Sequence, residues 1–388
     1  MEEILNPNEY GGLLYDCQEV KAVENVILNN KIFRYALKEK SETDIFEERI
    51  CERFGRKYAL GVNSGTSAIK VALKAIGINH GDRVLVSSYT FLASATSVLA
   101  LDGIPVPLEF DLNYGVNIQD LENELKKGCK AVILVHLQGK CFDIKPIIEL
   151  KNKYHFILIE DACQAMGTRC KGVLAGTLSD IGIFSFQQNK PLTSGEGGVL
   201  LTDNEDYYKI SRNYADMGSV RDYYPSWDKE GALIGDNYRM NNLQGAILNV
   251  QLSKFDKMMK IQRKNKKYIL DNLDRKNMLS TIINDFSEDD TGINILFLNQ
   301  NKNLVKECIE EALKEKIEMR YLWARPYYLQ KVIANAKLTP NDFEKNDCCF
   351  AEKVAETLIS ISLPPVLNQK QLDVIINLLN HLIKEKKL

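Results

Sequence analysis

Short apolar runs alternate with amphipathic stretches through the first two thirds of the chain. Runs bounded by Gly, Asn, Asp or Ser predict strands at residues 57–65, 83–89, 104–110, 130–137, 156–162, 180–186 and 197–203. Amphipathic patterns predict helices at 66–76 and 90–101. Strands that alternate with helices are typical of βαβ units, so the pattern predicts an α/β fold with a mainly parallel sheet between helices.

The pattern changes at about Asn241. A long amphipathic helix with a basic outer face is predicted over residues 242–273. It is followed by a strand-like run at 293–299 and helical patterns at 304–316 and 371–387. We therefore expect a large domain over 1–255 and a smaller C-terminal α+β domain over 256–388, with the long helix as their connector.

Charge gives no reason to expect nucleic acid or an anionic membrane as a partner. The 388 residues carry 50 Lys and Arg against 52 Asp and Glu. The basic run Arg263–Lys267 is short and is interpreted as a solvated helix face. No window approaches the roughly 20 apolar residues that span a bilayer.

The nine cysteines are scattered and include no CxxC pair. An odd number without the spacing of metal ligands predicts reduced thiols in a cytoplasmic protein and no metal site. The start, MEEILNPNEY, is acidic and has no apolar core, so it is not expected to be a signal peptide.

One lysine stands beside a glycine-rich turn, in SFQQNKPLTSGEGG at residues 185–198. A lysine at a strand end, if its amine is partly desolvated, can act as a nucleophile that forms a Schiff base. By position alone, Lys190 is more simply a surface lysine on a hairpin. Signals elsewhere in the chain favour the first interpretation.

Two further segments carry polar groups at strand ends. IEDACQAMG places Glu160 and Asp161 where α/β proteins bind ligands, and a carboxylate there can pair with a pyridinium nitrogen, bind magnesium or cap a helix. NSGTSAIK places Gly65, Thr66 and Ser67 at a helix start, which suits a phosphate or is an ordinary N-cap. Neither GxxxxGK[ST] nor GxGxxG follows a strand, so a phosphorylated cofactor fits better than ATP or NAD.

Aromatic and polar residues complete the series. Tyr89 and Phe91 lie at the junction between the second strand and its helix, where a ring could lie on a flat cofactor or simply belong to the core. Asn237 and Arg239 precede the long helix, where polar side chains are often caps. The order of phosphate turn, aromatic, strand-end acid and glycine-flanked lysine is that of a pyridoxal phosphate (PLP) enzyme with the aspartate-aminotransferase fold.

The chain resembles the DegT/DnrJ/StrS family of PLP-dependent sugar aminotransferases over nearly its full length. The matching segments are FEERICERFGRKYALGVNSGTSAIKVAL, SSYTFLASATSVLALDGIPVPLEFD, VHLQGK, IEDACQAMG, SFQQNKPLTSGEGGVLLTD and GDNYRMNNLQGAILNVQL. The lysine–GEGG segment and the NYRM segment are highly specific together. The resemblance implies a fold-type I PLP enzyme.

The resemblance also implies roles for individual residues. Lys190 matches the lysine that binds the cofactor covalently and then moves a proton, and Asp161 matches the acid that keeps the pyridine nitrogen protonated. Gln164 matches a polar position facing the 3-hydroxyl, and Phe91 matches the aromatic that stacks on the ring.

The phosphate site is implied in the same way. Gly65, Thr66 and Ser185 fall on phosphate-binding positions. Asn237 matches a residue that reaches the phosphate from the other subunit, which implies a homodimer with shared active sites.

The implied activity is transfer of an amino group from glutamate or glutamine to a keto or aldehyde sugar, nucleotide-linked or free, or to a cyclitol. A dehydratase, an aminobenzoate-type synthase and a non-catalytic regulator are the alternatives; relatives with histidine in place of the lysine are dehydratases. The segment LWARPYYLQ lacks the family's Pro-Leu-His, which leaves sugar contacts at Tyr327 and Tyr328 open. Arg34 either binds a carboxylate or is solvated.

Overall fold

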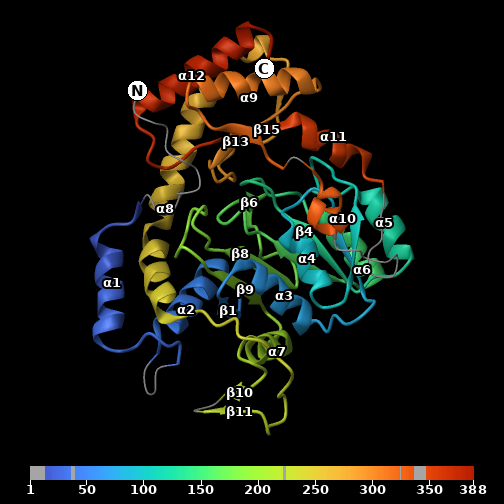
Figure 1. Cartoon of the computed structure of the whole chain (residues 1–388), viewed down its shortest axis with the longest axis vertical. Coiled ribbons are helices and arrows are strands. Elements are labelled where there is room, and N and C mark those ends of the chain that lie inside the picture. The colour runs from blue at the N-terminus through green and yellow to red at the C-terminus, as the bar shows by residue number, and fades with distance from the viewer. Residues whose placement is uncertain (1–13, 36–39, 222–223, 324, 336–346) are drawn as a thin grey trace.

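A seven-stranded sheet lies at the centre of the larger lobe of the molecule (Figure 1), in the order β1-β9-β8-β5-β4-β2-β3. Its strands are β1 (Tyr58–Val62), β2 (Arg83–Ser87), β3 (Ile104–Leu108), β4 (Ala131–Val135), β5 (Ile157–Asp161), β8 (Ile181–Ser185) and β9 (Gly198–Thr202). Neighbouring strands are parallel except at β9, which is antiparallel to β1 and β8. The predicted mainly parallel sheet is confirmed, and each predicted strand of it is present.

The computed structural model describes residues 14–35, 40–221, 224–323, 325–335 and 347–388. The amino-terminal MEEILNPNEY, which was not expected to be a signal peptide, lies outside these ranges. Among the described residues, no helix combines the length and hydropathy that crossing a membrane requires. Within the same ranges, no three His, Cys, Asp or Glu side chains are grouped so as to hold a metal ion.

Helices cover both faces of the sheet, because each strand sends alternate apolar side chains to opposite sides. Ile159 and Ile183 face one side, and Leu158 and Phe184 face the other. The helices on the first side are α3 (Gly65–Ala75), α4 (Ala93–Leu99) and α7 (Glu205–Ala215). Those on the second side are α2 (Glu42–Phe54), α5 (Ile118–Lys126), α6 (Lys145–Tyr154) and α8 (Asn242–Asp271).

Helix α8 is the long predicted helix, and it runs from the larger lobe into the smaller one (Figure 1). Its N-cap is Asn241, whose side chain accepts a hydrogen bond from the Gln244 backbone N–H while the Gln244 side chain accepts one from the backbone N–H of Asn241. It contacts α1 (Cys17–Leu28) and α2, and its end packs into the smaller core. The predicted domain boundary after residue 255 falls inside α8, and this division of the chain stays a prediction.

The smaller lobe contains a four-stranded sheet in the order β12-β13-β15-β14. Its strands are β12 (Thr281–Ile282), β13 (Asn294–Leu298), β14 (Met319–Tyr321) and β15 (Leu358–Ser362). Helices α9 (Lys302–Lys314) and α12 (Gln369–Lys384) share its apolar core. The remaining elements used below are the hairpin strands β6 (Arg169–Cys170), β7 (Val173–Leu174), β10 (Val220–Arg221) and β11 (Pro225–Ser226).

The basic run on α8 is not only a solvated face, which corrects the sequence-based interpretation. The ammonium of Lys266 is buried and lies 2.9 Å from a carboxylate oxygen of Asp290. Arg263 donates from Nε to the backbone oxygen of Asp290 at 2.5 Å. Lys264 and Lys267 are exposed, as expected. The run therefore helps to fasten the smaller lobe to α8.

Candidate active site

A pocket of about 470 Å³ opens at the carboxyl ends of β5 and β8. It brings together seven of the eight predicted site residues: Gly65, Thr66, Phe91, Asp161, Gln164, Ser185 and Lys190. The eighth, Asn237, is exposed and is not among the lining residues; its backbone forms a bridge with Asp216 instead. Neither Asn237 nor Arg239 caps α8, since that position belongs to Asn241.

The glycine-rich turn allows the hairpin of β8 and β9 to lie against the start of α3. Ser185 is paired with Gly198, and the connection between them carries Lys190 in a turn closed by its N–H donating to Gln187 at 2.9 Å. A Cβ at Gly198 would clash with the carbonyl oxygen of Ser64, so this approach requires glycine. The sequence thus places the lysine and the phosphate-type turn in one pocket.

Lys190 is half-buried in this pocket. Burial lowers the pKa of its ammonium group, against the opposing influence of Cys163 and of the carboxylate of Asp161. A larger share of its amine is therefore neutral near pH 7 than in an ordinary surface lysine. A neutral amine is the form that attacks a carbonyl group and accepts a proton.

The carboxylate of Asp161 is held by hydrogen bonds on both oxygens. Ser94 on α4 donates from Oγ to Oδ2 at 2.8 Å, and the N–H of Cys163 donates to Oδ1 at 3.2 Å. Thr90 lies 3.2 Å from the Ser94 hydroxyl, also within hydrogen-bonding distance. Asp161 is only 5% exposed but lines the pocket, so its carboxylate is fixed in orientation toward a ligand.

The neighbouring acid, Glu160, points to the other face of β5 and cannot replace Asp161. His136 lies 2.8 Å from its Oε1, and the N–H groups of Gly176 and Leu178 donate to its two oxygens. Burial alone would raise the pKa of Glu160, but these hydrogen bonds hold it below the ordinary value. Glu160 is a buried anchor for the loop before β8.

The turn before α3 has the features of an anion site. Ser64 is the N-cap and accepts a hydrogen bond from the Ser67 N–H at 3.0 Å. The Ser67 hydroxyl is already used, because it donates to Asn63 at 2.6 Å. Thr66 is exposed toward the pocket. Ser67 is not among the residues that line the pocket, whereas Gly65 and Thr66 line it beside a helix N-terminus.

Two aromatic predictions separate clearly. Phe91 is 55% exposed and lines the pocket. Tyr89 is fully buried and exchanges hydrogen bonds with the backbone of Trp323, accepting from its N–H at 3.2 Å and donating to its oxygen at 3.3 Å. Tyr89 is thus the core aromatic, and its hydroxyl fixes Trp323 at the edge of the pocket.

The smaller lobe supplies pocket residues that the sequence did not indicate. Arg320, Leu322 and Trp323 lie on or just after β14 and line the pocket. Arg320 is paired with Glu318 at 3.3 Å and keeps almost half of its side chain exposed. Tyr327 and Tyr328, considered for sugar contacts, are both buried and outside the lining. The available signal was the segment M-R-Y-L-W, in which an arginine stands close to two aromatic residues.

Arg34 is neither solvated nor free to bind a substrate carboxylate. It is 3% exposed, and its Nη2 donates to both carboxylate oxygens of Glu47, at 2.7 and 2.8 Å. Its Nη1 donates to the carbonyl oxygen of Gly61 at 2.9 Å. The carboxylate that Arg34 binds is thus an internal one, and the pair ties α2 to β1.

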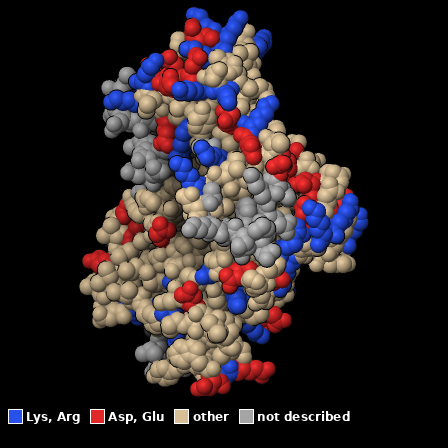
Figure 2. Space-filling view, turned by 45° about the vertical axis from the view of Figure 1, so that its right-hand side comes forward, with Lys and Arg blue, Asp and Glu red and all other residues tan. Residues whose placement is uncertain are grey.

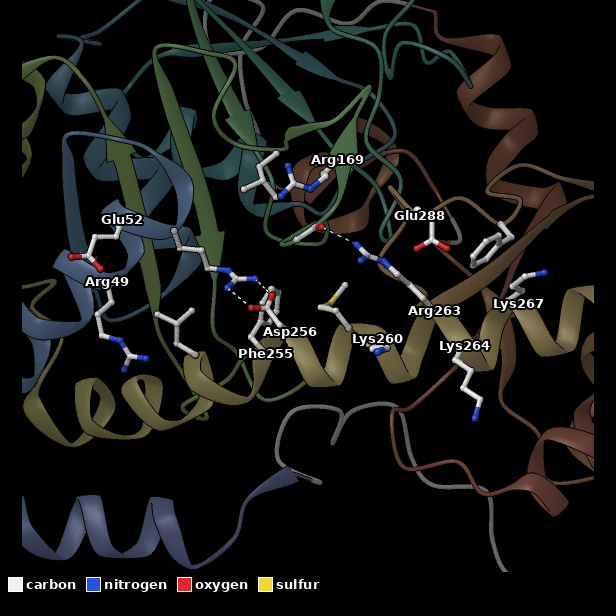
Figure 3. Close-up of a pocket in the computed structure, with 16 residues that line it drawn as sticks. Arg49, Glu52, Arg169, Phe255, Asp256, Lys260, Arg263, Lys264, Lys267 and Glu288 are labelled. Carbon is white, nitrogen blue, oxygen red and sulfur yellow. Dashed lines mark hydrogen bonds and ion pairs between the residues drawn. The ribbon is translucent and has the colours of Figure 1, made fainter.

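A second, larger hollow of about 980 Å³ runs along α8 and is called the basic groove here (Figure 3). Its apolar floor contains Leu252, Phe255 and Met259, and its residues come from α2, α8, the β6–β7 hairpin and residues 286–288. Figure 3 shows Arg263 pointing toward that hairpin, while Lys264 and Lys267 extend from α8 in other directions.

The arginines of the basic groove already have partners in the protein. Arg53 forms a two-pronged ion pair with Asp256, and Arg169 donates to the carbonyl oxygen of Gly172 at 2.7 Å. Arg263 donates to the carbonyl oxygen of Gly167 at 3.3 Å. These contacts join surface elements, so we assign the candidate active site to the smaller pocket.

The fold is that of structurally characterised aminotransferases. An aminotransferase from Psychrobacter cryohalolentis superposes with a TM-score of 0.84 at 26% sequence identity, covering 96% of this chain and 98% of that chain. Residues 16–380 match the model of the DegT/DnrJ/EryC1/StrS aminotransferase family. The chain belongs to this family, and the resemblance inferred from its motifs is confirmed.

Two curated relatives describe the range of the family. GDP-perosamine synthase from Caulobacter vibrioides is 36% identical over 215 residues, which are 54% of this chain and 56% of that protein. The match thus spans little more than half the length of that relative. The dTDP-3-amino-3,6-dideoxy-alpha-D-galactopyranose transaminase from Aneurinibacillus thermoaerophilus is 28% identical over 346 residues, covering 87% of this chain and 89% of that protein.

Proposed function

We propose that this protein is a PLP-dependent aminotransferase that moves an amino group from glutamate or glutamine to a keto or aldehyde sugar. The observation that carries this proposal is the pocket in which Lys190, with its lowered pKa, lies with Asp161 and the turn at Gly65 and Thr66. A pocket with an activated amine, a fixed carboxylate and an anion site suits a phosphorylated aldehyde cofactor.

The pocket residues fit that cofactor. Gly65, Thr66 and Ser185 would hold its phosphate, and the exposed face of Phe91 would cover its ring. Among the described residues, the buried Oε1 of Gln164 has no hydrogen-bond partner. Because an unpartnered buried polar atom is costly, this atom indicates a ligand group that donates to it, as the 3-hydroxyl would.

PLP, when bound, supplies a carbonyl carbon that condenses with amines and a ring that takes up electrons when a substrate C–H bond breaks. Lys190 would hold the cofactor covalently at rest and then carry the proton between donor carbon and cofactor. Asp161 would accept a hydrogen bond from the protonated ring nitrogen, and Ser94 would keep that carboxylate in place. The pocket residues would therefore act by positioning and proton transfer.

A nucleotide-linked sugar is the favoured acceptor, with a free keto-sugar or a cyclitol as the alternative. The two relatives above have names that refer to GDP- and dTDP-linked sugars. Arg320 offers an exposed cation at the pocket edge that suits a diphosphate, and Trp323 offers an apolar surface beside it. The product would be an amino sugar.

The activity is tested with purified protein loaded with PLP. Glutamate or glutamine labelled with ¹⁵N at the transferable nitrogen is supplied together with GDP- and dTDP-linked 4-keto-sugars, free keto-sugars or cyclitol ketones. We expect the label to appear in one of these acceptors. A deoxygenated sugar without nitrogen would identify a dehydratase, an aromatic product from a cyclic keto acid would identify an aminobenzoate-type synthase, and PLP binding without turnover would identify a regulator.

We also propose a homodimer whose two active sites are shared. Several apolar side chains in residues 217–234 are exposed in the single chain, namely Met217 (41%), Tyr224 (69%), Trp227 (52%) and Ile234 (92%). Exposed apolar groups on one segment favour an interface. Asn237 follows this segment and is exposed, so it is available to reach the phosphate site of the partner subunit.

Subunit mixing tests the shared site. A Lys190→Ala chain and an Asn237→Asp chain, each inactive, should regain activity when mixed, because a heterodimer has one site with both lesions and one with neither. With random exchange, about half of the dimers are mixed and roughly a quarter of all sites recover. Exchange without recovery would show that Asn237 does not act across the interface. A cytoplasmic location stays a prediction, testable by cell fractionation.

A further inference from the structure

Two cysteines lie on separate segments of the chain that contact one another. Cys141 lies in the loop between β4 and α6, and Cys170 lies in β6. Contacts on both sides hold these segments together. The hydroxyl of Thr168 donates to the carbonyl oxygen of Gly139 at 2.9 Å, and further along Lys171 and Asp143 form an ion pair at 2.6 Å.

The two cysteines lie between these contacts, and each thiol shifts the pKa of the other. The sulfur of Cys141 is also 3.9 Å from Nε2 of His136, and Cys141 and Leu174 both pack against the apolar cluster that contains Phe184. Both cysteines are half-buried, so a small oxidant can reach them. The two flanking contacts hold the segments that carry these thiols together, which favours formation of a bond between the two sulfurs.

The two thiols also differ in protonation, so that one can act as the nucleophile while the other keeps its proton. Interaction with Cys141 lowers the pKa of Cys170 to about 7, and the same interaction raises the pKa of Cys141 well above its ordinary value. Near neutral pH about half of Cys170 is thus thiolate, while Cys141 keeps its proton. A reactive thiolate beside a second thiol is the arrangement of a redox-sensitive site.

Other cysteines lack this combination. Burial raises the pKa of Cys51, Cys129 and Cys308 to about 11 in each case. Cys163 lines the active-site pocket, and burial raises its pKa as well. Cys129 is half-buried like Cys170, which makes it a matched control.

We propose that Cys170 and Cys141 form a reversible disulfide when the protein meets a peroxide. The Cys170 thiolate attacks one peroxide oxygen, the O–O bond breaks, and hydroxide leaves, so that Cys170 becomes a sulfenic acid. The Cys141 sulfur then attacks the Cys170 sulfur, and its proton leaves with the departing hydroxyl group as water. Two thiols and one hydrogen peroxide thus give one disulfide and two waters, and an external thiol reverses the reaction.

The test uses the full-length protein treated with one equivalent of hydrogen peroxide and then digested without reductant. We expect a peptide pair linked through Cys141 and Cys170, with the loss of two hydrogen atoms, that dithiothreitol separates. In the Cys141→Ala variant, the sulfenic acid on Cys170 should persist and be captured by dimedone. The Cys129→Ala variant should form the linked pair as the unaltered protein does.

A second measurement compares the rates at which individual cysteines are alkylated, which depend on the fraction of each that is thiolate. At pH 7, iodoacetamide should modify Cys170 roughly 10²-fold faster than Cys129, once the lower intrinsic nucleophilicity of a low-pKa thiolate is included. Cys141→Ala should reduce this advantage by removing the group that lowers the pKa of Cys170. The proposal is overturned if peroxide oxidises Cys170 to a sulfinic acid without any linked pair, or if Cys170 and Cys129 react at equal rates. Neither outcome depends on the proposed aminotransferase activity.

Discussion

The pocket at the strand ends and the basic groove along α8 differ in size, in lining and in the state of their charged groups. The groove, at about 980 Å³, is roughly twice as large as the pocket of about 470 Å³. In the groove, Arg53 and Asp256 neutralise one another at the surface. In the pocket, Lys190 and Asp161 face a ligand space without forming such a pair. The volume of a hollow therefore does not identify the active site. The better indicator is a desolvated charged group that is free to interact with a ligand.

The surface view adds to this comparison. Figure 2 shows lysine, arginine, aspartate and glutamate interspersed over the upper lobe, and fewer charged side chains over the lower half of that face. Interspersed charges agree with a net charge of −2 and give no single-sign field that would steer a polyanion to the molecule. The basic groove is therefore interpreted as a structural junction between α2, α8 and the β6–β7 hairpin.

The largest expected effect comes from replacing one lysine in each of the two hollows by alanine. Lys190→Ala should lower kcat of the PLP-loaded enzyme by at least the roughly 10²–10⁴-fold that acid–base catalysis contributes. Lys260→Ala, on the exposed face of α8 in the groove, should leave kcat unchanged. Equal losses in both variants would contradict the distinction between the hollows. Borohydride reduction should fix the cofactor on Lys190 and on no other lysine.

The next effect compares the two aspartates. Asp161→Asn keeps the shape but removes the charge that would hold the ring proton, so kcat should fall about 10²–10³-fold, the usual worth of one such electrostatic contact. Asp256→Asn removes half of an exposed ion pair and should change stability by less than about 1 kcal/mol. Steady-state kinetics and thermal unfolding measure the two outcomes. Unchanged turnover of Asp161→Asn would assign its role to another group.

A smaller effect is expected from Ser94, which donates a hydrogen bond to Asp161. Ser94→Ala removes the 2.8 Å hydrogen bond to Oδ2, and loss of a hydrogen bond to a charged group costs about 1.5–3 kcal/mol. We expect kcat to fall by about one to two orders of magnitude, with a shift in the pH profile. Thr96→Ala, on the same helix, loses only a bond to the Leu92 carbonyl and serves as the control. Equal behaviour of both variants would reject a positioning role for Ser94.

The smallest effect concerns the groove alone. Arg53→Ala removes the pair with Asp256 and the contact of its guanidinium carbon 4.8 Å from the centre of the Phe255 ring. Exposed ion pairs and such cation–π contacts are each worth about 1 kcal/mol or less. We expect a lower melting temperature with unchanged kcat and KM. A large loss of activity would place the groove in the functional machinery.

The fold was predictable where local pattern and tertiary environment agree. All seven strands of the large sheet are buried on both faces and read as short apolar runs. Strand β15 was missed although it lies inside the small sheet, because L-I-S-I-S directly follows a helix without an intervening turn. The patterns gave no indication of β14 either, since its three residues form an edge strand.

The site was predictable where one segment carries its own signal. Lys190, Asp161 and the turn at Gly65 each stand at a strand end, so sequence and topology place them together. Arg320 and Trp323 were missed because they come from the other lobe, and their position depends on how β14 meets the large sheet. The burial of Arg34 could not be predicted, because it depends on an ion pair with Glu47, which lies in a separate helix.

The antiparallel strand β9 has a consequence for how the chain is made. Tyr58 of β1 pairs with Thr202 of β9, and among the strands that the structure describes β1 lies at the sheet edge with β9 as its neighbour. During synthesis β1 leaves the ribosome long before its partner, so its apolar residues must wait unpaired until the chain has grown past residue 202. Contacts between such distant segments close slowly. The nascent chain therefore exposes an apolar, unpaired strand for much of translation, and a chaperone can bind this strand during that time.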